Sequence, residues 1–63
     1  MKYTAIKLRG LPHYLWFETG NIEEDALEFT ATEGWGKNGA LTKVRCMKSE
    51  IRSRIESDEL QYN

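Results

Sequence analysis

The run Gly34-Trp35-Gly36-Lys37-Asn38-Gly39 decides how the second half of this 63-residue chain folds. Asn-Gly is the strongest short-range signal for a two-residue hairpin turn, because glycine reaches positive φ at little steric cost. The run therefore predicts a hairpin that joins a strand over 26–33 to a strand over 40–47. Trp35 lies between two glycines, so its ring either folds back over the sheet or projects outward as part of a recognition loop.

The register of this hairpin raises a difficulty. Counting pairs outward from an Asn38-Gly39 turn places Glu33 opposite Val44. Val44 belongs to the apolar face of its strand, so this register would bury a carboxylate. We therefore expect a bulge at Gly34 or Gly36, or a loop wider than two residues.

Three other segments carry structural signals. Residues 2–9 alternate between an apolar and a more polar face, and residues 13–18 are rich in strand-favouring aromatic side chains. Ser49 is a suitable helix N-cap, and Ile51 and Ile55 are spaced as helical i,i+4 neighbours. This pattern therefore predicts a C-terminal α-helix over residues 50–60.

The predicted fold class is α+β in a single domain, 1–63. Four strands form an antiparallel β-meander, and one helix follows it; the expected ranges are about 2–9, 13–18, 26–33 and 40–47 for the strands and about 50–60 for the helix. The alternative for the fourth segment is a longer helix that begins near Leu41, because Leu41, Val44, Met47 and Ile51 follow helical spacing.

Composition excludes two common ways of stabilising a small domain, a disulfide and a structural zinc site. Cys46 is the only cysteine, so there is no intrachain disulfide, and one Cys with one His cannot supply a four-ligand zinc site. A domain of about 60 residues buries only about 60% of its unfolded surface, so we expect stabilisation by homo-oligomerisation. The sequence lacks an apolar run of about 20 residues for a membrane span. A lone free cysteine suits the reducing cytoplasm.

No motif indicates catalysis or a cofactor. Cys46 and His13 are the usual types of nucleophile and base, and they lie on different predicted strands. The acidic run Glu23-Glu24-Asp25 lacks the ligand spacing and central glycine of a calcium loop. Gly34-Trp35-Gly36-Lys37 lacks the spacing of a phosphate-binding loop. We therefore expect a protein that is not an enzyme and holds no cofactor or metal.

The aromatic side chains favour a protein-binding surface, because Tyr and Trp bring large contact area at low entropic cost. We predict Tyr14, Trp16 and Trp35 as contact anchors, with Glu23, Glu24 and Asp25 as rim charges. The corresponding function is that of a small accessory or inhibitory protein, of the kind found in phages. It would bind or occlude a partner protein whose identity the sequence does not indicate.

Binding of single-stranded nucleic acid is the alternative. Lys7 and Arg9 share one face of the first predicted strand, and Lys43 and Arg45 share one face of the fourth. If those strands were neighbours, four cations and nearby aromatic rings would share a surface suited to phosphates and stacked bases. Carboxylates on the intervening strand would offset these charges, and the formal net charge is −1. Protein binding is therefore preferred over nucleic-acid binding.

Overall fold

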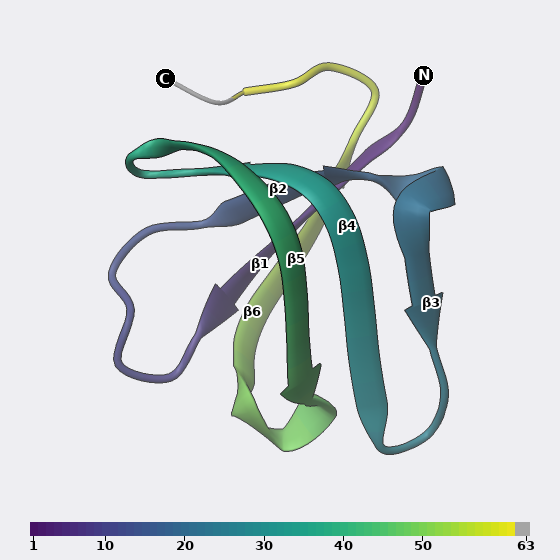
Figure 1. The fold of residues 1–63 in the computed structure, drawn as a ribbon, viewed down its shortest axis with the longest axis vertical. Helices are drawn as coiled ribbons and strands as arrows, with labels where there is room; N and C mark the ends of the chain where they lie inside the picture. Colours follow the sequence, from purple (N-terminus) through teal and green to yellow (C-terminus); the bar gives the residue numbers. More distant parts are fainter. Residues whose placement is uncertain (62–63) are drawn as a thin grey trace.

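The computed structural model describes residues 1–61, and for residues 41 and 42 it describes the backbone alone. One antiparallel sheet contains six strands: β1 (Tyr3–Leu8), β2 (Leu15–Glu18), β3 (Ile22–Glu24), β4 (Glu28–Gly36), β5 (Gly39–Met47) and β6 (Ile51–Ser57). Two short 3-10 helices, η1 (Thr19–Asn21) and η2 (Lys48–Glu50), connect β2 to β3 and β5 to β6. The sheet curls around its own core (Figure 1).

Strand β4 organises the sheet because it pairs with three other strands. β5 runs along the whole of one edge of β4. On the other edge, β3 pairs with the first part of β4, where Ile22 lies opposite Ala31. β2 meets the last part, where Trp16 lies opposite Trp35. β1 then pairs with both β2 and β6, which completes the curl.

The predicted four-stranded meander with a C-terminal helix is wrong. Residues 1–61 contain no α-helix, and the only helical segments among them are the three-residue η1 and η2. β3 occupies the expected acidic connection, and β6 occupies most of the expected helix. None of the helical segments in residues 1–61 has the length and apolar character that crossing a bilayer requires.

A register shift in β6 explains the wrong helix prediction. Ile51 lies opposite Leu8 and Ile55 lies opposite Ala5, so β6 has one residue more than β1 between these pairs. The extra residue is Arg52, and it reverses the alternation of faces. Ile51 packs against the core, whereas Ile55 is on the outer face and exposed. Their four-residue spacing therefore does not mark one apolar stripe.

The glycine-tryptophan run forms a tight hairpin turn. Lys37 and Asn38 are the two turn residues between the paired Gly36 and Gly39. The turn therefore starts one residue earlier than expected. One register runs through the hairpin from end to end, so the expected bulge at Gly34 or Gly36 and the wider loop are both wrong.

Glu33 changes which face of β4 points at the core. Its φ is 55°, in the left-handed region that residues with a Cβ rarely adopt. Phe29 and Ala31 are buried before it, and Gly34 and Gly36 are buried after it. Glu33 itself is exposed. One residue in the left-handed region thus keeps the carboxylate in solvent without altering the hairpin register.

The core lies inside the curl. Four side chains without exposed surface form its centre: Ile6, Phe17, Phe29 and Ala31. The rings of Phe17 and Phe29 meet edge to face, with centroids 6.2 Å apart. A Cβ at position 34 would overlap the Phe17 ring and lie 2.5 Å from the carbonyl oxygen of Trp16. β4 therefore passes β2 so closely that position 34 accommodates only glycine.

Gly34→Ala is expected to lower the free energy of unfolding by about 2–3 kcal/mol, because the methyl group overpacks against the Phe17 ring and the β2 backbone. Gly20→Ala is the matched control, since nothing lies within 4 Å of a Cβ built there. Urea unfolding measures both variants. Equal stabilities for the two would contradict the close approach of β4 to β2.

Glu33→Gly is expected to raise the free energy of unfolding by up to about 1 kcal/mol, because glycine adopts the left-handed region without the cost of a Cβ. Thr32→Gly is expected to lower it by about 1 kcal/mol, because Thr32 has ordinary strand backbone. The same unfolding assay compares the two. A loss of similar size in both variants would refute the strained backbone at Glu33.

Candidate functional site

The structure brings the predicted anchors Trp16 and Trp35 together as opposite residues of β2 and β4, but all three predicted anchors are largely covered. Trp16 retains 6% of its exposed area and is part of the buried set. Trp35 is half-buried, and its ring meets that of Tyr3 edge to face with centroids 6.3 Å apart. Trp35 therefore folds back over the sheet. Tyr14 is half-buried, with its hydroxyl 2.7 Å from the Ser53 hydroxyl on β6.

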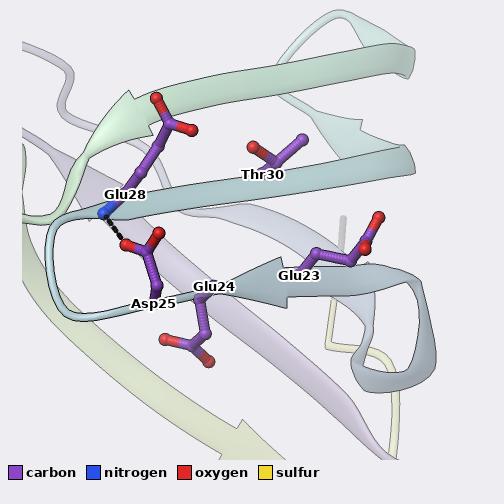
Figure 2. Close-up of a pocket in the computed structure, with 5 residues that line it drawn as sticks. All are labelled: Glu23, Glu24, Asp25, Glu28 and Thr30. Carbon is purple, nitrogen blue, oxygen red and sulfur yellow. Dashed lines mark hydrogen bonds between the residues drawn. The ribbon is translucent and has the colours of Figure 1, made fainter.

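The predicted acidic rim borders a shallow groove of about 280 Å³. Its lining residues are Glu23, Glu24, Asp25, Glu28 and Thr30. In Figure 2, the Glu24 carboxylate lies on the opposite side of β3 from the other labelled side chains. No group of three or more His, Cys, Asp or Glu side chains within the described part of the chain is arranged to hold a metal ion.

Asp25 shapes the turn between β3 and β4. Its Oδ1 accepts hydrogen bonds from the backbone N–H groups of Leu27 and Glu28, each at 2.8 Å. These two donors hold the pKa of Asp25 below its usual value. Asp25 therefore holds the turn in one conformation, and its carboxylate is already engaged.

Glu24 joins three elements of the fold. Arg54 on β6 donates from Nη1 and Nη2 to its two carboxylate oxygens at 2.9 and 2.8 Å, and Lys48 Nζ of η2 lies 2.8 Å from Oε1. The Arg54 guanidinium also stands over the Phe29 ring, 5.8 Å from its centroid. The hydrogen bonds from Arg54 and then Lys48 lower the pKa of Glu24 from 4.5 to about 2.

The four predicted nucleic-acid-binding cations are separated into two pairs. β2 and β4 lie between β1, which carries Lys7, and β5, which carries Lys43 and Arg45. Arg45 Nε lies 3.0 Å from Glu28 Oε2. Arg9 Nε lies 3.3 Å from Glu50 Oε2. The arrangement on neighbouring strands that the alternative prediction required is therefore not formed.

A larger groove of about 570 Å³ lies between the β1–β2 loop and the start of β6. It is lined by Lys7, Leu8, Gly10, Leu11, Pro12 and Arg52, and we call it the cationic groove. Its lining holds two cations and no carboxylate. Leu11 retains 48% of its exposed area, so the groove offers apolar surface between positive charges.

Local backbone structure preforms the cationic groove. The N–H of Leu11 donates to the carbonyl of Leu8 at 3.0 Å, and Gly10 has φ of 83°, as the third residue of a type II turn requires. Lys7 Nζ stands 4.9 Å from the centroid of the Tyr14 ring, whose hydroxyl contacts β6. Tyr14, one of the predicted anchors, thus contacts a residue that lines this groove.

The sequence prediction missed the cationic groove for a definite reason. The sequence pattern places Arg52 in the expected helix over 50–60, away from the segment between the expected strands 2–9 and 13–18. The useful signal is an apolar residue between Gly10 and Pro12, directly after two cations, Lys7 and Arg9. Only the pairing of β1 with β6 brings Arg52 to that loop.

Comparison with protein-family models, curated proteins and solved structures finds no match to this chain. Function is therefore inferred from the two grooves and from the charges around them.

Glu24 is expected to make the fold sensitive to acid. The pKa of Glu24 is about 2 in the folded protein, against 4.5 for a carboxyl group without these partners. Its contribution to the free energy of unfolding is therefore complete above pH 4.5 and is lost as the pH falls toward 2. Glu24→Gln should lower the free energy of unfolding at neutral pH by about 1–2 kcal/mol. It should also flatten the acid dependence in that window.

Urea unfolding at a series of pH values measures this effect. Glu23→Gln is the matched control on the same strand, because the Glu23 side chain is exposed and points away from Arg54 in the sheet alternation. An acid dependence of Glu24→Gln that parallels that of the parent protein would show that another group is responsible.

Proposed function

We propose that this chain is a non-enzymatic protein-interaction module that binds an acidic segment of a partner protein in the cationic groove. The observation that carries the proposal is the composition of that groove. Apolar surface from Leu8, Leu11 and Pro12 lies beside Lys7 and Arg52, with no carboxylate in the lining. A segment with an apolar side chain between carboxylates complements both properties.

The state of the two cations supports this proposal. Among the described residues, neither Lys7 nor Arg52 forms an ion pair with a carboxylate, whereas Arg45, Lys48 and Arg54 each do. An incoming carboxylate therefore meets cations that no acidic group within residues 1–61 already neutralises. Because the groove is open to solvent, such contacts chiefly give specificity and fast association, and the apolar floor supplies affinity.

The chemistry of the two candidate catalytic residues fits a binding protein. Cys46 packs against the core, and burial raises the pKa of its thiol, which disfavours the nucleophilic thiolate. His13 lies in the exposed β1–β2 loop.

A protein of this size that occupies a segment of its partner acts by occluding it. A free thiol at Cys46 fits the cytoplasm as its location.

Nucleic-acid binding is less well supported. Phosphate binding along a strand needs several cations in one track, and here β2 and β4 separate Lys7 from Lys43 and Arg45. Arg45 is further neutralised by Glu28. The cationic groove alone offers few charges, and its apolar floor suits a side chain better than a phosphate.

Arg52→Glu is expected to weaken binding of a labelled peptide, four glutamates flanking one leucine, by about tenfold or more, because it replaces attraction by repulsion at the groove. Fluorescence anisotropy at about 50 mM salt, where screening is modest, measures the affinity. Lys43→Glu is the matched control: it makes the same charge change on an exposed strand residue outside the groove.

Equal losses for Arg52→Glu and Lys43→Glu would mean that the peptide responds only to overall charge, and the proposal would then be rejected. The same holds if the parent protein binds no peptide at about millimolar concentration, the weak limit of useful recognition. An oligothymidine of similar charge forms the third arm. If the protein binds the oligothymidine more tightly than the peptide, and Lys43→Glu abolishes this binding, the result would support the nucleic-acid alternative instead.

A further inference from the structure

The turn between β3 and β4 presents an exposed apolar side chain between carboxylates. Leu27 retains 69% of its exposed area, although large apolar side chains are usually covered in a folded domain. Asp25 and Glu28 flank it in the sequence and line the neighbouring acidic groove. We call Leu27 with these two carboxylates the acidic knob.

The acidic knob is held in a fixed conformation. Asp25 accepts hydrogen bonds from the N–H groups of Leu27 and Glu28, and the N–H of Asp25 donates to the Glu28 carbonyl at 3.0 Å. The Leu27 carbonyl accepts a hydrogen bond from the N–H of Lys48 at 2.8 Å. Docking this turn therefore costs little additional conformational entropy.

The acidic knob and the cationic groove are complementary in chemistry. The knob has one leucine between two carboxylates: that of Asp25, which accepts hydrogen bonds from the N–H groups of the turn, and that of Glu28, which also pairs with Arg45. The groove has apolar surface beside Lys7 and Arg52. In Figure 1, the turn between β3 and β4 and the loop between β1 and β2 lie on different sides of the curled sheet. Within one copy the knob therefore does not meet the groove, so a knob of this kind could reach the groove only from a second copy.

We propose that this protein self-associates head to tail, with the acidic knob of one copy docked in the cationic groove of the next. The proposal rests on the proposed function and names a second copy as its partner. The contact joins two different surfaces, so each dimer retains one free knob and one free groove. Association through so small a contact is weak and increases with protein concentration.

Two single variants test this arrangement. Leu27→Ser removes the apolar part of the knob and leaves the groove intact, and Arg52→Glu damages the groove and leaves the knob intact. Sedimentation velocity should show that the parent grows beyond a dimer as concentration rises. Each variant alone should sediment as a monomer. An equal mixture of the two should form dimers and nothing larger, because only one productive contact remains.

Circular dichroism establishes that both variants are folded, which is expected because Leu27 and Arg52 are exposed. A parent protein that stays monomeric at about millimolar concentration would overturn the proposal. So would self-association that persists in both variants, as pairing through a free strand edge would produce. A mixture without dimers, combined with peptide binding that Arg52→Glu abolishes, would reject self-association and leave the proposed function standing.

Discussion

The close approach of β4 to β2 at Gly34 is the constraint on which the rest of the fold depends. β4 pairs with β3 over its first part and meets β2 near its end, so it must turn across the core between them. At the crossing, the Phe17 ring and the Trp16 carbonyl leave no space for a Cβ. The left-handed backbone of Glu33, one residue earlier, redirects the strand so that Gly34 faces inward. The path of β4 between β3 and β2 follows from these two adjacent residues.

The second requirement of a curled sheet is control of its edges. β3 and β6 lie at the two ends of the path of paired strands, and an uncovered edge is a template for further pairing. Arg54 is on the face of β6 shared with Ile6, and it reaches Glu24 of β3 through two hydrogen bonds. An inward-pointing charge on an edge strand opposes aggregation, and here it also covers the Phe29 ring. The same contact therefore closes the curl and protects it.

Aromatic residues predicted the strand that overlaps β2, and the hairpin signal placed the strands that overlap β4 and β5. Alternation predicted the strand that overlaps β1. It failed where a single residue reverses the faces. Arg52 is such a residue in β6, and it made two isoleucines on opposite faces resemble a helical stripe. Glu33 is the other, and its φ has no sequence signal when the residue is neither Gly nor Asn. The cationic groove was unpredictable for the same reason, since Arg52 reaches the β1–β2 loop only through that register. The sequence predicts Lys7 and Tyr14 as binding residues, but on two separate surfaces.

The near-zero net charge conceals an uneven distribution of charge. Around η2 and β6, ion pairs join acidic and basic side chains: Glu24 binds both Lys48 and Arg54, and Arg54 also contacts Glu56. At the β1–β2 loop, Lys7 and Arg52 border apolar surface without a carboxylate in the groove lining. Structural ion pairs thus engage carboxylates elsewhere and at Arg9, which pairs with Glu50, whereas the groove lining has none. Recognition then depends on where the fold leaves charged side chains unpaired, and the total composition does not give these positions.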